Sequence, residues 1–242
     1  MSAKVRLKLQ RKAKGLLYRA GVHRLLGWVE HPLAMAAWTI RASRWIAAHR
    51  KLGYNDFYSP RRDYARRFKA FDHLVKTEAL DGPIDYLEFG VMGGKSIGWW
   101  VERNPHPQSR FVGFDTFTGL PEDWDQFKQG EMTADGAPPA IDDPRCRFVA
   151  GLFQETLPGF LAGFERRSRL VVHMDADLYT STLYVLTSIA PILRPGDVLL
   201  FDEFNVPLHE FRAFSEFVSA YRVRYEVLTA VNNYYQVTMK LL

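Results

Sequence analysis

The sequence predicts an α/β protein with a mostly parallel seven-stranded sheet, an antiparallel last strand and additional N-terminal helices. From residue 84 onward, short apolar runs alternate with stretches of helical periodicity, which is typical of a parallel sheet covered by helices on both faces. Near the C-terminus, two apolar runs are separated only by a turn that contains Asn232-Asn233, and such a turn predicts a hairpin. The length of 242 residues suits one large α/β domain or two small ones.

Residues 1–50 differ in charge from the rest of the chain. They contain eleven Lys or Arg and one acid, Glu30, although the whole chain carries a formal net charge of only +5. The remainder is therefore mildly acidic, so the overall charge does not indicate nucleic-acid binding. Apolar residues at helical spacing predict two helices in this part, over 4–29 and over 32–49, with Pro32 at the start of the second.

We expect residues 1–53 to form a basic helical extension and residues 54–242 to form the main domain. Two roles are open for the basic helices, which can cover the main domain or a partner subunit, or lie on an anionic membrane. Their content of Lys and Arg and their lack of acids also resemble a mitochondrial presequence.

Composition excludes several classes of protein. No run of about 18 apolar residues predicts a transmembrane helix. The single cysteine, Cys146, excludes an intrachain disulfide and a cysteine metal cluster. We expect a cytoplasmic protein that acts on a small molecule, binds no nucleic acid and forms a homo-oligomer.

The main domain begins with a loop over 54–64 and a helix over 62–80, in which Tyr64, Phe68 and Phe71 share one face. The strands that follow are expected over 84–89, 110–114, 147–150, 170–174, 197–201, 225–229 and 234–241. The helices between them are expected over 96–103, 157–164, 182–193 and 210–221. The irregular stretch 116–145 is rich in Gly, Pro and Asp, and its length predicts a lid, a binding loop or a disordered segment.

A glycine-rich turn joins the first of these strands to a helix in "LEFGVMGGKS" (87–96). Its final Gly-Lys-Ser resembles the end of a phosphate-binding loop, but that loop needs a glycine where Phe89 stands. Gly90 comes one residue late, so the backbone cannot trace the same cradle. Glu88 at the strand tip would also repel a polyphosphate. A P-loop-like nucleotide hydrolase remains an alternative.

The same turn favours a nucleoside ligand that carries a carboxylate and little phosphate. Gly90 and Gly93 let a ligand approach the backbone, and the helix that follows aims its first N–H groups at an anion. The next strand ends at Asp115, whose carboxylate can accept hydrogen bonds from both ribose hydroxyls. S-adenosylmethionine has these groups, and its positive sulfonium and ammonium suit the nearby Glu88.

Further contacts with this cofactor are expected at both of its ends. Lys95 and Ser96 would cap the helix or face the methionine end. The adenine ring would rest on the segment from Gly151 to Gln154, just after the third strand, with Gln154 as the candidate for its amino group.

Four carboxylates stand at two predicted strand ends, with Asp175 and Asp177 after the fourth strand and Asp202 and Glu203 after the fifth. Adjacent parallel strands lie about 5 Å apart and end at the same edge of a sheet, so the two pairs can converge on one cation. Oxygen ligands suit Mg²⁺, Mn²⁺ or Ca²⁺. The alternative is that Asp177 caps a helix and that Asp202 or Glu203 only shapes a turn.

Five motifs, in this order, resemble those of class I S-adenosylmethionine-dependent methyltransferases: "YLEFGVMGGKSIGWW", "GFDTFTGLPEDW", "GLFQETLP", "HMDADLYTST" and "GDVLLFDEF". More narrowly, they are similar to the macrocin O-methyltransferase group, which acts on sugar hydroxyls of natural products. The similarity covers about residues 54–242 and implies a Rossmann-like fold with a parallel sheet. The N-terminal residues carry no comparable signal.

The resemblance implies transfer of a methyl group to a hydroxyl of a sugar or of another small hydroxylated metabolite. It also implies that a divalent cation, Mg²⁺ or another, is held by aspartates at the two strand ends and lowers the pKa of the acceptor oxygen. Here the second pair is Asp-Glu, where the resemblance would give Asp-Asp. A non-catalytic module that binds an adenosyl ligand is a further alternative.

Catalytic residues are predicted at two places. Asp175 should be required for turnover, and His209 after the fifth strand is a candidate general base, with helix capping as its alternative role. His173 lies inside an apolar strand and is expected to pack in the core. Four aromatic residues lie in segments able to close over an acceptor, unless they only pack: Tyr58, Tyr64, Trp124 and Phe127.

Overall fold

The computed structural model describes residues 2–124 and 126–242. Residues 1 and 125, which fall in the predicted extension and in the predicted long loop, lie outside this description. The chain forms two compact units, one up to Arg41 and one from Ala42 to Leu242. The predicted boundary follows residue 53, whereas the compact units divide after Arg41.

The first unit consists of helix α1 (Ala3–Arg19) and the first part of helix α2 (Val22–Ala48). The sequence predicted that the second helix begins at Pro32, and this is wrong because Pro32 lies inside α2. The break between the helices lies at Gly21, where φ is +64°. Glycine adopts this left-handed conformation readily, and most other residues do not. Among the described residues, no helix is long and apolar enough to cross a membrane.

The second unit is built around a single mixed sheet, which has eight strands over the described residues. Their order across the sheet is β1-β7-β8-β6-β5-β2-β3-β4. The bounds are β1 (Tyr54–Asn55), β2 (Ile84–Phe89), β3 (Arg110–Asp115), β4 (Cys146–Ala150), β5 (Arg169–Met174), β6 (Val198–Phe201), β7 (Tyr225–Val231) and β8 (Gln236–Leu241). All seven predicted strands are present, and the eighth, β1, adds two residues where a loop was expected.

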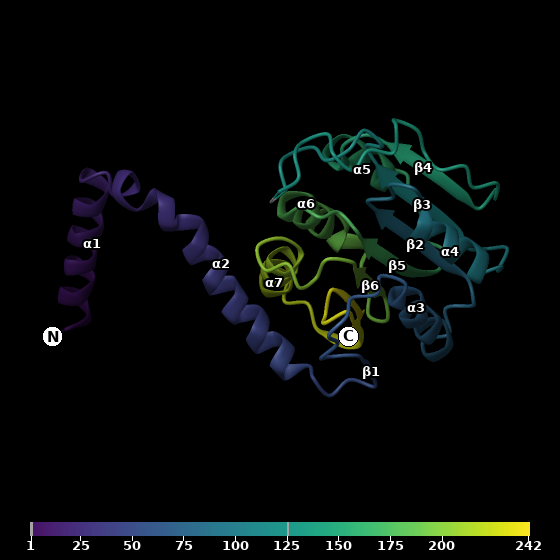
Figure 1. The fold of residues 1–242 in the computed structure, drawn as a ribbon, viewed down its shortest axis with the longest axis horizontal. Coiled ribbons are helices and arrows are strands. Elements are labelled where there is room, and N and C mark those ends of the chain that lie inside the picture. The colour runs from purple at the N-terminus through teal and green to yellow at the C-terminus, as the bar shows by residue number, and fades with distance from the viewer. Residues whose placement is uncertain (1, 125) are drawn as a thin grey trace. The chain divides into compact units, whose positions relative to one another are not determined.

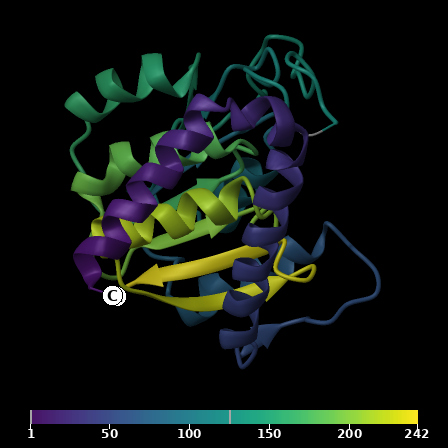
Figure 2. The ribbon, with the colours of Figure 1, turned by 90° about the vertical axis from the view of Figure 1, so that its left-hand side faces the viewer.

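Strands β2 to β6 are mutually parallel where they pair, and β8 runs antiparallel to both β6 and β7. The final hairpin, yellow in Figure 2, turns at Asn232 and Asn233, which both have positive φ. Strand order changes direction beside β2, because β3 and β4 extend the sheet on one side and β5 and β6 on the other. Ligands of such sheets bind at this switch point, outside the carboxyl ends of the strands.

Helices cover both faces of the sheet (Figure 1). One face carries α3 (Arg66–Thr77) and α4 (Lys95–Arg103), and the other carries α5 (Phe153–Ala162), α6 (Tyr179–Ile189) and α7 (Glu210–Tyr221). A 3₁₀ turn, η1 (Ala190–Ile192), extends α6. The central strands β2 and β6 are buried along their whole length, as expected for parallel strands between two helical layers. This buried frame holds the strand ends of the site in fixed positions.

Candidate active site

A cavity of about 710 Å³ opens at the carboxyl ends of the parallel strands. Its wall combines the glycine-rich turn after β2, the end of β3, the start of α5, the segments after β5 and β6, and residues of the long loop. The predicted site residues among those that line it are Gly90, Gly93, Lys95, Ser96, Asp115, Gln154, Asp175, Asp177 and Glu203. The predicted long binding loop therefore forms part of this wall.

Gly90 makes the closest backbone approach in the site. Its φ is +91°, and a Cβ placed on it would lie 1.7 Å from the carbonyl oxygen of Asp175. No side chain fits at this position, so the crossing of β2 past β5 requires glycine. Gly93 differs, because a Cβ there would meet nothing within 4 Å. Its lack of a side chain leaves room on the cavity side of the turn.

Helix α4 begins directly after Gly94, which is in the left-handed conformation with φ of +73°. Its first residues, Lys95 and Ser96, line the cavity. The N–H groups of a first helical turn have no partners within the helix, and the helix dipole adds partial positive charge there. This end of the cavity can therefore bind a carboxylate.

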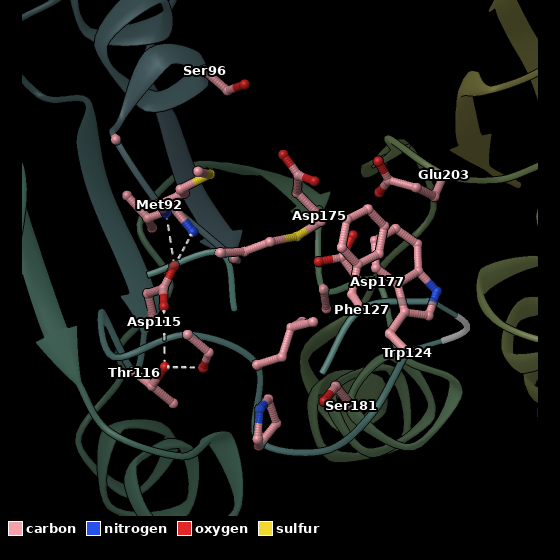
Figure 3. A pocket seen from close by; sticks show the side chains of 18 of the residues that line it. Met92, Ser96, Asp115, Thr116, Trp124, Phe127, Asp175, Asp177, Ser181 and Glu203 are labelled. Carbon is pink, nitrogen blue, oxygen red and sulfur yellow. Dashed lines mark hydrogen bonds between the residues drawn. The ribbon is translucent and has the colours of Figure 1, made fainter. Parts of the chain in front are cut away.

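Asp115 connects the end of β3 to the glycine-rich turn (Figure 3). Its Oδ2 accepts hydrogen bonds from the backbone N–H groups of Val91 and Met92, both at 2.7 Å. Its Oδ1 accepts one from the N–H of Phe117 at 2.8 Å. The carboxylate thus fixes the turn. Its Oδ2 already accepts two hydrogen bonds, and its Oδ1, with one short hydrogen bond, keeps acceptor capacity.

The start of α5 forms another side of the cavity through Leu152, Phe153 and Gln154. Gly151, just before them, has φ of +135° and donates its N–H to the carbonyl oxygen of Asp115 at 2.9 Å. Gly151 is absent from the described residues that line the cavity. It turns the chain from β4 toward the cavity, and the three residues after it supply the surface.

Three carboxylates come together on the other side of the cavity from Asp115 (Figure 3). Oxygens of Asp175, Asp177 and Glu203 lie within 4.8 Å of one another. Burial, together with repulsion from neighbouring carboxylates, raises the pKa of Asp175 and of Glu203 well above the usual range. The same two causes raise the pKa of Asp177 to about 8. Such a group of oxygens could hold a cation, whose charge would offset the repulsion.

Asp202 lies within the same reach of Asp175, but its charge is already compensated. It is fully buried, and its Oδ2 accepts hydrogen bonds from Nη1 of Arg67 at 2.9 Å and from the hydroxyl of Tyr64. Burial by itself would raise the pKa of Asp202, but the charges of His173 and Arg67 hold it below its usual value. Asp202 is not among the described residues of the cavity wall.

His173 packs in the core, as predicted from its apolar strand. It also lies beside Asp202, as Arg67 does. The ring is fully buried, and burial alone would lower its pKa. The carboxylates of Asp202 and Glu88 outweigh this and raise the pKa of His173 to about 9. A cation bound by His173, Asp175 and Asp202 would have to displace the proton of His173, because only the neutral ring can ligate a metal.

Glu88, a predicted cofactor residue, lies inside this buried network. Its Oε2 accepts a hydrogen bond from the hydroxyl of Tyr86 and lies 3.4 Å from Nδ1 of His173. It is 1% exposed, and the described cavity wall does not include it. Its charge therefore acts mainly on His173.

His209 occupies the position directly before α7, but its side chain makes no capping hydrogen bond there. Its Nδ1 accepts a hydrogen bond from the backbone N–H of Tyr179 at 3.3 Å, and its ring lies edge-on to Trp124 with centroids 6.2 Å apart. The described lining residues do not include His209. Of the four aromatic candidates, the lining includes Tyr64, Trp124 and Phe127 but not Tyr58, whose side chain is 74% exposed.

The cavity residues that the sequence reasoning missed include Arg62, Arg67 and Tyr235. Tyr235 donates its hydroxyl to Oε1 of Glu203 at 2.9 Å, and the guanidinium of Arg62 lies 3.7 Å from the centre of the Tyr235 ring. A signal existed for Arg67, because it stands three residues after Tyr64 and so shares the apolar face of a predicted helix. A charge on such a face indicates a buried partner.

The fold and this cavity define a Rossmann-like class I methyltransferase. Residues 87–204 match the model of a methyltransferase domain family. The fold is shared with the calicheamicin methyltransferase CalS11, at a TM-score of 0.60 and 23% identity, over 85% of this chain and 91% of that chain. It is also shared with the O-methyltransferase NovP, at a TM-score of 0.57 and 21% identity, over 72% and 79%.

Two relatives are similar in sequence over most of their length. The mycinamicin III 3''-O-methyltransferase of Micromonospora griseorubida is 31% identical over 177 residues, which cover 61% of this chain and 68% of the relative. The 8-demethyl-8-(2,3-dimethoxy-alpha-L-rhamnosyl)-tetracenomycin-C 4'-O-methyltransferase of Streptomyces olivaceus is 30% identical over 185 residues, which cover 67% of each. The chain belongs to the class I S-adenosylmethionine-dependent methyltransferases, in the group of natural-product sugar O-methyltransferases that the motifs indicated. It is an enzyme, and neither the nucleotide hydrolase nor the non-catalytic module describes it.

Proposed function

We propose that the protein transfers a methyl group from S-adenosylmethionine to a hydroxyl oxygen of a sugar, or of another small hydroxylated metabolite. The observation that carries this proposal is the two-sided cavity, with the glycine-rich turn and Asp115 on one side and three carboxylates on the other. Both relatives at 30% identity or more are named for O-methylation, one of them on a rhamnosyl-bearing compound.

The cofactor would occupy the side formed by the turn. Gly90, Gly93, Lys95 and Ser96 would surround its amino-acid end, because the open start of α4 can bind a carboxylate there. Asp115 would accept hydrogen bonds from the ribose hydroxyls with its remaining acceptor capacity. Gln154 and its neighbours at the start of α5 would contact the adenine ring.

The acceptor would enter between the carboxylates and the aromatic residues of the wall. Tyr64, Trp124, Phe127 and Tyr235 offer ring faces that suit the apolar side of a sugar. Asp175 stands where the two halves meet, since its carbonyl abuts Gly90 and its carboxylate joins the acidic group. It can hold the acceptor hydroxyl in line with the donated methyl, and orientation supplies most of what this displacement needs.

The hydroxyl proton must leave as the methyl group arrives. Asp175 is placed to accept it, because its carboxylate lies in the cavity wall where the cofactor side meets the acceptor side. His209, the other predicted base, is not among the described residues of the cavity wall. The proposal therefore relies on Asp175.

A divalent cation fits the group of Asp175, Asp177 and Glu203. All three donate oxygen atoms, and Oε2 of Glu203 is buried without a hydrogen-bond partner among the described residues. Asp202, in contrast, is neutralised by Arg67, so we place the predicted Mg²⁺ site on the other three carboxylates. A cation bound there would act as a Lewis acid on an acceptor oxygen.

The test is methyl transfer from labelled S-adenosylmethionine to a library of free sugars, nucleoside-diphosphate sugars, glycosides and small amines. We expect a hydroxylated sugar compound to gain the label, and Asp175→Ala to lose turnover while it keeps S-adenosylhomocysteine binding in calorimetry. Labelling of amines alone would refute O-methylation. Full turnover by Asp175→Ala would refute the role of Asp175.

A further inference from the structure

The unit up to Arg41 carries an amphipathic surface to which the proposed function assigns no role. Seven of the 17 residues of α1 are Lys or Arg, and none is acidic. Val5, Leu9 and Leu16 recur at helical spacing on one side of this helix, and none of its residues is buried. The side chains of Leu9 and Leu16 are 53% and 65% exposed.

The first part of α2 also exposes large apolar side chains. Leu26, Leu33 and Ile40 follow one another at intervals of two helical turns and so lie on one face. They are 54%, 64% and 60% exposed, and Trp28 is 79% exposed. The two helices together therefore present several large apolar side chains among basic ones.

We propose that this basic amphipathic surface, formed by α1 and by α2 up to Ile40, binds the surface of an anionic lipid membrane. Its Leu, Val and Trp side chains enter the boundary between headgroups and acyl chains, and its Lys and Arg side chains contact lipid phosphates. The helices lie in the plane of the interface, because the density of charge on α1 makes its passage through hydrocarbon costly.

Charge argues for lipid against two other occupants, the same helix of a second copy and a nucleic acid. Residues 2–29 contain no Asp or Glu, so packing of α1 against the α1 of a second copy would bring like charges together. A nucleic acid would satisfy the basic residues, but it would leave the exposed Leu and Trp side chains in water. An anionic lipid surface offers phosphates to the basic side chains and acyl chains to the apolar ones.

The test is co-sedimentation of the full-length protein with vesicles of phosphatidylcholine alone and of phosphatidylcholine with phosphatidylglycerol. We expect binding to the anionic vesicles, and added salt should weaken it. The variant Leu9→Asp/Leu16→Asp should bind at least about tenfold more weakly, because it removes two apolar anchors and adds negative charge. Its control is Lys69→Gln/Lys76→Gln on α3, which lowers the net charge by the same two units on the main domain and should bind like the parent protein.

As a control for folding, each variant should bind S-adenosylhomocysteine in calorimetry as the parent protein does. The proposal would be overturned if the Leu9→Asp/Leu16→Asp variant bound anionic vesicles as strongly as the parent protein. It would also be overturned if the parent protein did not bind anionic vesicles. Two further measurements would overturn the proposal and identify another occupant. If light scattering showed a dimer of the parent protein that the Leu9→Asp/Leu16→Asp variant does not form, the occupant would be a second copy. If the parent protein bound duplex DNA and not anionic vesicles, the occupant would be a nucleic acid.

Discussion

The guanidinium Nη1 of Arg67 lies 2.9 Å from Oδ2 of Asp202, and both side chains are almost fully buried. The guanidinium carbon of Arg67 lies 4.2 Å from the centre of the Tyr64 ring, and its Nη1 lies 3.9 Å from the carboxylate of Asp175. Arg67 thus places a fixed positive charge behind the acidic side of the cavity. This charge distinguishes Asp202, which is compensated, from the three carboxylates that face the cavity.

Arg67→Gln should destabilise the protein strongly, because buried Asp202 would lose the cation that donates a hydrogen bond to it. We expect the free energy of unfolding to fall by about 3–5 kcal/mol in urea titrations. The control is Arg103→Gln, which breaks a pair with Asp72 whose side chains are 45% and 41% exposed. That change should cost less than about 1 kcal/mol. Similar losses in the two variants would mean that the Arg67–Asp202 pair is unimportant.

Glu203→Gln should weaken the binding of a divalent cation by at least about tenfold, as measured by Mn²⁺ electron paramagnetic resonance, because the site loses a charged oxygen ligand. Asp142→Asn, on an exposed part of the long loop, should leave the affinity unchanged. Since the pKa of Asp177 is about 8, protons compete with the cation below that value. Affinity should therefore rise with pH up to about pH 8, and a flat profile would contradict the proposed site.

The stability of the fold should depend on pH through His173. Its pKa is raised from 6.5 to about 9, so its stabilising charge is fully present below pH 6.5 and is lost as pH rises to about 9. In urea titrations over this range, the free energy of unfolding should fall by roughly 3 kcal/mol on this account. His173→Gln should remove most of that slope, and His106→Gln should preserve it. If His173→Gln kept the slope of the parent protein, the predicted charge on His173 would be disproved.

Gly90→Ala should prevent stable folding, because the new Cβ would collide with the carbonyl oxygen of Asp175 and φ there is +91°. We expect a loss of several kcal/mol, measured by thermal unfolding and by soluble yield. Gly159→Ala in α5, where a Cβ meets nothing within 4 Å, should leave stability unchanged or slightly higher. A Gly90→Ala protein as stable as its parent would show that the backbone can shift aside.

Asp115→Asn should lower the affinity for S-adenosylhomocysteine by at least about tenfold in calorimetry, because hydrogen bonds to a charged acceptor are the stronger kind. Some of the loss would come from the turn, where this carboxylate also accepts the N–H groups of Val91 and Met92. Asp135→Asn, on the exposed loop, changes the charge equally and should bind the ligand normally. Unaltered affinity in Asp115→Asn would place the ribose elsewhere.

Much of the fold could be predicted because its signals are local. Each strand is a short apolar run, and each helix after it repeats apolar residues at helical spacing, so the sequence located all seven principal strands. The error at Pro32 also came from a local signal, because proline is common at the first position of a helix. Here Pro32 lies inside α2, and the break between the two helices is at Gly21. Strand β1 escaped prediction because a pair of residues carries no periodicity, and it forms only by pairing with β7.

The sequence by itself determined the type of fold, the glycine-rich turn and the presence of four carboxylates at two strand ends, since these follow from residue type and spacing along the chain. Only the tertiary structure decided how those carboxylates differ. Arg67 comes from α3 and His173 from within β5, and together they compensate Asp202 and leave Asp175, Asp177 and Glu203 toward the cavity. The reason is physical: the charge state of a buried group depends on the cations within a few ångströms of it, and those neighbours are distant in the sequence.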